Sequence, residues 1–181
     1  MKCVSVIAMV MILLSSSMLW AQEPVESSAI FKKNSFGVGL GIPYGVLGAN
    51  VDVNIASNFN LSAGVGTTVF AGIGYNIGLK YFFTPVERTF RPRVSGYYGV
   101  NSVVVKEYIG IAKEDEGETY TGLSLGVGGQ WMWGNTKSNG LDFDIIYIAT
   151  SGLDVDELRD EGFDVEEPGK VKISIGYRRA F

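Results

Sequence analysis

The ionisable side chains that could do chemistry in this sequence stand at alternate positions, interleaved with apolar residues. Two pairs show the spacing, Arg91 with Arg93 and Asp142 with Asp144. In extended backbone, residues two apart project from the same face, so we expect one shared interior for eight charges: Asp52, Lys80, Arg91, Arg93, Asp142, Asp144, Lys172 and Arg178. Buried charges persist only when they are paired. A structural polar interior is therefore the favoured interpretation, and a narrow pore whose selectivity these residues set is the alternative.

Catalytic chemistry has little support in the sequence. The chain contains no histidine, which is the commonest general base near neutral pH, and no serine or aspartate constellation replaces it. We therefore predict that the protein is not an enzyme and uses no cofactor. The net charge of −4 argues against nucleic-acid binding, which requires a basic stripe.

A second group of ionisable residues is acidic and falls in two long connecting segments, 106–118 and 150–168. The candidate residues for binding divalent cations or a basic partner are Glu114, Asp115, Glu116, Asp154, Asp156, Glu157, Asp160 and Glu161. Carboxylate oxygens suit Ca²⁺ and Mg²⁺. The alternative is that both segments are solvated loops whose charges repel one another.

The elements that must position these residues are strands, because apolar residues recur at every second position beyond residue 34. In the last segment, Val171, Ile173 and Ile175 alternate with lysine and serine. Eight such segments are predicted, at 35–42, 45–56, 58–67, 69–83, 90–105, 119–133, 140–149 and 169–181. Most have the roughly 9–11 residues that a tilted membrane-spanning strand needs.

The composition favours a membrane-embedded barrel. Charged residues make up 19% of the chain, against about 25% in soluble domains. Beyond the first twenty residues no apolar run is long enough for a membrane-spanning helix, and a strand-built span must be closed. We predict an all-β fold, an eight-stranded antiparallel up-and-down transmembrane barrel over residues 35–181. A soluble lipocalin-like lipid-binding barrel is the remaining alternative, although its outer face would need charges where this chain has glycine, serine and asparagine.

The end of the chain sets the direction of every strand. If Phe181 lies in the periplasm, the connections at 43–44, near 68, at 106–118 and at 150–168 lie outside the cell. The two longest connections are then extracellular, as outer-membrane barrels require. Aromatic residues near the periplasmic rim are expected to form an interfacial girdle: Tyr81, Phe83, Trp131, Trp133, Phe143, Tyr177 and Phe181.

The first residues have the pattern of an export signal. Lys2 precedes an apolar run at 4–14, and Ala21 is a small residue suited to cleavage. We expect residues 1–21 to be a cleaved signal peptide and residues 22–34 to be a periplasmic lead-in.

With its alternating last strand and terminal Phe181, the segment 35–181 resembles the small eight-stranded outer-membrane proteins of the OmpA/OmpX type. The resemblance implies a location in the bacterial outer membrane, contact with lipopolysaccharide, and recognition of the last strand by the barrel assembly machinery. Cations shared with lipopolysaccharide phosphates could then bridge to the acidic loops. Arg179 departs from the pattern, since an apolar residue is usual there, but near the interface it can snorkel to water. The expected role is structural support of the envelope or surface contact.

Overall fold

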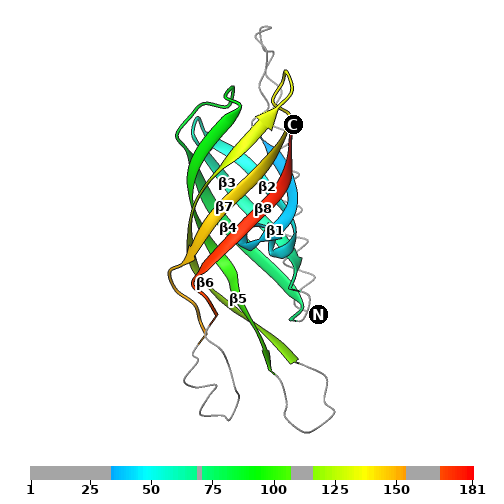
Figure 1. The fold of residues 1–181 in the computed structure, drawn as a ribbon, viewed down its shortest axis with the longest axis vertical. Coiled ribbons are helices and arrows are strands. Elements are labelled where there is room, and N and C mark those ends of the chain that lie inside the picture. The colour runs from blue at the N-terminus through cyan, green and yellow to red at the C-terminus, as the bar shows by residue number, and fades with distance from the viewer. Residues whose placement is uncertain (1–33, 69–70, 107–115, 154–167) are drawn as a thin grey trace. The chain divides into compact units, whose positions relative to one another are not determined.

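A computed structural model describes residues 34–68, 71–106, 116–153 and 168–181. These residues form a closed barrel of antiparallel strands that follow one another in chain order, with β1 paired to β8 (Figure 1). The elements are β1 (Ser35–Gly41), η1 (Ile42–Tyr44), β2 (Val46–Ala56), β3 (Phe59–Thr67), β4 (Ile73–Phe82), β5 (Phe90–Lys106), β6 (Glu116–Trp133), β7 (Asn139–Ile148) and β8 (Val171–Ala180). The predicted all-β, eight-stranded antiparallel up-and-down barrel is therefore confirmed. The predicted signal peptide and all but the last residue of the lead-in lie outside the described residues.

The two ends of the barrel differ in their connections. We call the end with the connections at 57–58, 83–89 and 134–138, which also carries Phe181, the turn end, and the opposite end the loop end. At the loop end β5 leaves β4 after Gly99 but stays paired with β6 as far as Lys106. This hairpin projects beyond the other strands (Figure 1).

The outer face of the strands is apolar and the inner face is polar, as the alternating sequence pattern predicts. Among the described residues, thirty large apolar side chains are exposed, between 38% and 78%, and ten apolar side chains are buried. The exposed set covers the outer surface of the barrel, with Val127, Ile145 and Ile173 paired side by side on β6, β7 and β8. Charged and polar side chains fill the inside, including Asp52, Lys80 and Arg93.

The predicted fourth strand began too early. Residues from 69 onward continue its alternation, yet β4 starts only at Ile73. The backbone amide of Thr68 donates to the carbonyl of Gly72 over 2.9 Å, and the amide of Ala71 donates to the Thr68 hydroxyl over 3.0 Å. Gly72 has a φ of 84°, which glycine adopts at low cost. Thr68, Ala71 and Gly72 therefore belong to a turn before β4. The other strand ends lie within three residues of the prediction.

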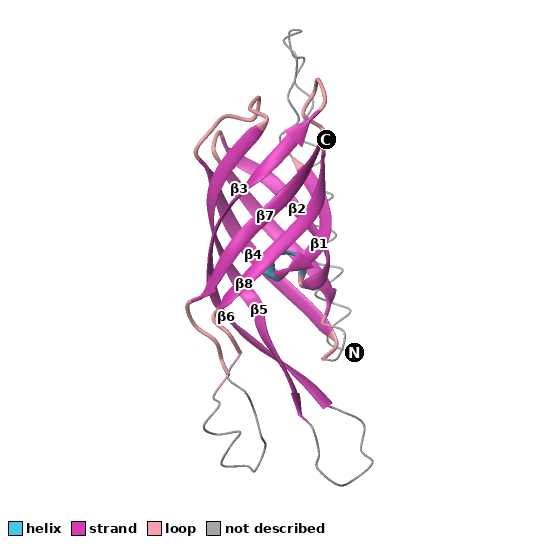
Figure 2. Ribbon diagram, viewed as in Figure 1, coloured by secondary structure: helices cyan, strands magenta, loops and turns pink. Residues whose placement is uncertain are grey.

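The connection between β1 and β2 is the main departure from the predicted arrangement. Pro43 and Tyr44 were expected in an outer loop, but Ile42–Tyr44 form a 3-10 turn, and all three residues are buried. The turn contacts β1, β2, β3, β4, β5 and β8, so it lies within the barrel (Figure 2). Left-handed backbone at Gly41 (φ 110°) and Gly45 (φ 65°) flanks it on both sides. We call Ile42–Tyr44 the plug.

No helix among the described residues is long and apolar enough to cross a membrane.

Candidate functional site

The plug fits because glycines leave room for the Tyr44 ring. A Cβ atom at Gly39 would lie 2.9 Å from the Cε2 atom of Tyr44, and one at Gly37 would lie 3.2 Å from Cε1. On neighbouring β8, a Cβ at Gly176 would overlap the hydroxyl end of the same ring. Because even the smallest side chain would collide here, glycine is required for close approach rather than for backbone flexibility.

The backbone of the plug is seated on the opposite wall. Glycines of β2, β3 and β4 face the carbonyl oxygens of residues 43–45, and a Cβ at any of these glycines would collide with them: Gly48, Gly64, Gly66 and Gly74. The side-chain amide of Asn76 donates to the carbonyl of Ile42. The Ile42 side chain packs with Tyr97, Ile146 and Ile148. The plug is therefore packed against β1 and β8 on one side and against β2, β3 and β4 on the other.

Next to the plug lies a continuous ion network. The guanidinium of Arg93 on β5 contacts Asp144 at 2.6 Å and Asp142 at 3.0 Å, both on β7. Arg178 on β8 pairs with the other oxygen of Asp142 and, at 2.8 Å, with Asp52 on β2. Lys80 on β4 donates to both oxygens of Asp52 at 2.9 Å. The charges thus alternate in sign from Asp144 to Lys80.

Neutral groups complete the network and attach the plug to it. Arg178 donates to the Ser35 hydroxyl at 2.9 Å and to the Asn50 amide oxygen at 2.8 Å. The Tyr44 hydroxyl donates to Asp142 at 3.2 Å. The paired side chains are at most 2% exposed, so no water-sized space adjoins them.

Two of the eight predicted interior charges lie outside this network. Arg91 is buried, donates to the Gln130 side-chain oxygen at 3.2 Å and stands 3.9 Å over the Phe82 ring. Lys172 is half-buried, and the described residues offer it no ion pair. It precedes Arg178 by six residues, roughly 20 Å along an extended strand. Lys172 shares the parity of the interior charges, but it lies nearer the loop end.

The predicted girdle residues lie on the outer surface near the turn end. The Tyr81 ring stands 4.9 Å from Phe59 and 5.2 Å from Phe83, and Phe90 stacks on Phe143 at 6.1 Å between ring centroids. Trp131, Trp133, Tyr177 and Phe181 are exposed on the same surface. The Tyr177 hydroxyl donates to Asn139 at 2.6 Å.

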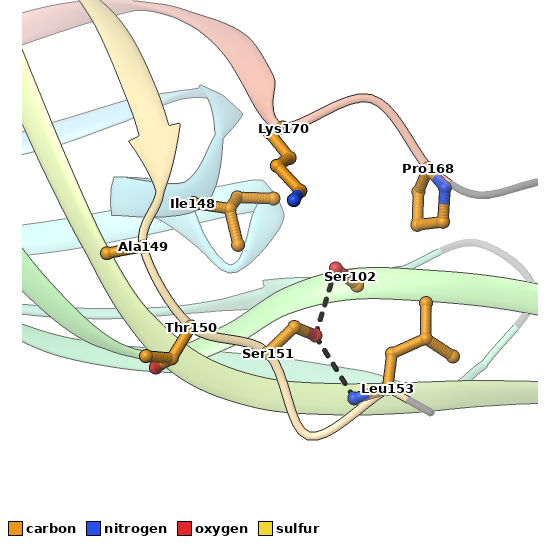
Figure 3. A pocket seen from close by; sticks show the side chains of 8 residues that line it. All are labelled: Ser102, Ile148, Ala149, Thr150, Ser151, Leu153, Pro168 and Lys170. Atoms are coloured by element: carbon orange, nitrogen blue, oxygen red, sulfur yellow. Dashed lines mark hydrogen bonds between the residues drawn. The ribbon is translucent and has the colours of Figure 1, made fainter. Parts of the chain in front are cut away.

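A small pocket lies at the loop end, between the β5–β6 hairpin and the connection that follows β7 (Figure 3). Its volume is about 220 Å³. The Ser151 hydroxyl donates to Ser102 at 3.4 Å and accepts from the Leu153 amide at 3.3 Å, while Lys170 lies across the pocket. Leu153 also packs against Val104 and Tyr120. The lining contains no acid among the described residues.

The proposed cation-binding acids cannot be placed. Glu116 is the first residue of β6, and its side chain is not described. The others lie outside the described residues: Glu114, Asp115, Asp154, Asp156, Glu157, Asp160 and Glu161. Within the described part of the chain, no group of three His, Cys, Asp or Glu side chains could hold a metal ion.

Fold and interior together define a small closed β-barrel of inverted polarity, apolar outside and ionic inside, with a glycine-seated plug. Among solved structures, the chain is similar to the crystal structure of the N-terminal β-barrel domain of OprF from Pseudomonas aeruginosa. The identity is 13% and the TM-score 0.49, over 82% of this chain and 94% of that one. No family model matches the chain, and no curated protein matches it.

Proposed function

We propose that this chain is an integral protein of the bacterial outer membrane, a closed structural barrel without enzymatic activity. The observation that carries the proposal is the outer surface, where thirty large apolar side chains are exposed against ten buried in the described part of the chain. A soluble monomer rarely exposes contiguous apolar patches beyond a few hundred Å². In water this exposed apolar surface is unfavourable, whereas in a bilayer its contact with lipid is stabilising. A closed barrel also leaves no unpaired strand edge in lipid.

The interior counts against a soluble lipid carrier. Such a barrel needs an apolar cavity for its ligand, with the charged residues outside. Here the charges point inward, and the Tyr44 ring occupies the space beside them. Both features favour a membrane-embedded barrel over a lipocalin-like one.

Fractionation of cells that express the full chain tests the location. We expect the protein in the outer-membrane fraction, resistant to carbonate extraction, and migrating differently on a gel before and after heating. The amino-terminal sequence of the mature protein would show whether residues 1–21 are removed. Recovery in the aqueous fraction after carbonate extraction would overturn the proposal.

The buried ion network supports a closed barrel rather than a pore. Side chains that line an aqueous path must be exposed to water, whereas the paired charges are at most 2% exposed. Eight strands enclose a space that side chains just fill. In planar bilayers we therefore expect no steady large conductance from the purified protein. A sustained open current would replace the structural role with that of a narrow pore.

The loop end is the part that we propose to face the cell exterior. It carries the long β5–β6 hairpin and the connection after β7, which would display the acidic loop residues for envelope support or surface contact. Divalent cations bridging these carboxylates to lipopolysaccharide phosphates would anchor the loops. Calorimetric titration with Ca²⁺ tests this part separately, and the absence of heat at millimolar Ca²⁺ would remove it.

A further inference from the structure

The buried charges of the barrel interior do not balance. The described residues include three buried acids, Asp52, Asp142 and Asp144, and four buried bases, Lys80, Arg91, Arg93 and Arg178. The ion network uses all three acids with three of the bases. Arg91 is the base left over, and a buried guanidinium without a counter-charge is expensive.

Arg91 and its neighbour Gln130 also hold unused hydrogen-bond donors. The Nε atom of Arg91 and the Nε2 atom of Gln130 are buried without a partner, although the two side chains touch through the Gln130 oxygen. The residues themselves are only 5% and 2% exposed. Each unmade hydrogen bond to a buried donor costs free energy, so two neighbouring donors favour the binding of an acceptor from outside the chain.

Both side chains line a small cavity at the turn end, with Ser35, Asn60 and Lys137 among the other lining residues. The lining contains two cations, Arg91 and Lys137, and no carboxylate. Glu87 in the adjacent turn is exposed and makes no ion pair with Arg91 in the described part of the chain, so it acts on Arg91 only as a more distant charge. Ser35 accepts from Arg178, so its own hydroxyl proton can be donated. The cavity therefore has donors and positive charge but lacks a charged acceptor.

We propose that this cavity binds a monatomic anion, chloride under ordinary conditions, between Arg91, Gln130 and Lys137. Its volume of about 10 Å³ corresponds to roughly one water-sized particle. A chloride ion is somewhat larger than water, so the lining side chains must move apart slightly to admit it, whereas a phosphate would require a much larger rearrangement. Water could accept from the two free donors but would place no negative charge in direct contact with Arg91, whose nearest carboxylates act on it only from a distance. An anion satisfies both requirements, and hydrogen bonds to it are charge-assisted.

Anion-dependent stability tests the proposal. The full chain, refolded in lipid vesicles, is unfolded with urea while chloride replaces gluconate at constant ionic strength. Once chloride exceeds its dissociation constant, each tenfold rise should lower the unfolding equilibrium constant about tenfold. Arg91→Gln should abolish this dependence. Arg88→Gln, which removes the same charge from an exposed position in the neighbouring turn, should keep it.

A direct measurement covers the case in which Arg91→Gln does not fold. Crystals of the unmodified protein grown with bromide should give an anomalous peak within contact of Arg91 Nε and Gln130 Nε2. Lys137→Met, at a half-buried site, should weaken the chloride dependence without removing it. The proposal is overturned by a cavity without a bromide peak, by a stability indifferent to chloride, or by equal dependence in the Arg91 and Arg88 variants.

Discussion

The hydroxyl of Tyr44 donates a hydrogen bond to Asp142 over 3.2 Å, although the two residues are 98 positions apart in the chain. Asp142 is also the acid shared by Arg93 and Arg178. Through this one hydrogen bond, the connection between β1 and β2 is attached to the centre of the ion network. Plug and network therefore form one structural unit, and changes in either should be felt by the other.

Tyr44→Phe removes this hydrogen bond but keeps the ring on its glycine seat. Since Asp142 keeps both arginines, we expect the free energy of unfolding to fall by about 0.5–1.5 kcal/mol, measured by urea titration in lipid vesicles. Tyr98→Phe is the control, because that hydroxyl belongs to an outward-facing ring that is 58% exposed. An equal loss in both variants would show that the Tyr44 hydroxyl contributes nothing of its own.

Gly176→Ala should displace the plug, because the new methyl group would collide with the Tyr44 ring. Overpacking of this kind costs about 1–3 kcal/mol, and the same unfolding titration measures it. Gly96→Ala is the matched control, as its Cβ would meet only Leu125 Cδ2, at 3.9 Å. In a Tyr44→Ala background the cost of Gly176→Ala should shrink; an unchanged cost there would place the collision elsewhere.

Asp142→Asn should be the most damaging single change in the network. It leaves Arg93 and Arg178 each short of one carboxylate contact in a site that is at most 2% exposed. Breaking a buried pair from one side costs about 3–5 kcal/mol. Glu87→Gln, which changes an exposed carboxylate at the turn end, should cost almost nothing. A loss below about 1 kcal/mol for Asp142→Asn would contradict the role assigned to the network.

Two substitutions on the outer face of β4 test the membrane-embedded surface. Ile77→Arg puts a charge in the middle of the strand and should cost about 2–4 kcal/mol in a bilayer, whereas Ile73→Arg, at the first residue of the strand, should cost about 0–1 kcal/mol. Both side chains are exposed, 53% and 70% respectively, so burial within the protein does not separate them. Equal costs in vesicles would argue against lipid around this strand.

The alternation of apolar and small polar residues was sufficient to predict the strand order, the closed barrel and the inward direction of the charges. Strand pairing in a closed antiparallel meander follows chain order, so no long-range information was needed. Which charges meet was not predictable, because the partners of Arg178 lie on β2 and β7, and their heights depend on strand stagger. Lys172 shows this limit of the sequence pattern. Its place in the alternation matches that of the interior charges, but it lies nearer the loop end than the ion network does.

The plug was missed because its signal lies outside the connection itself. The stretch Gly41–Gly45 has the composition of an ordinary turn. The position of the plug is indicated by glycines on five strands, which meet around residues 43–45 only after the barrel closes. In the sequence alone, those glycines indicated only that this face of the strands lacks the charges that a soluble barrel would need. A glycine stripe opposite a short connection that carries an aromatic residue is the pattern that could have revealed it.

Arg178 has a consequence for the time course of folding. From the last strand it reaches Ser35 on β1, 143 positions away, and Asn50 on β2, 128 positions away. Contacts of such separation form late, after almost the whole chain is available. Interactions that are absent from the folding transition state act mainly on the unfolding rate. Arg178, which joins the first and last strands, is therefore expected to change the folding rate little and mainly to slow the unfolding of the closed barrel.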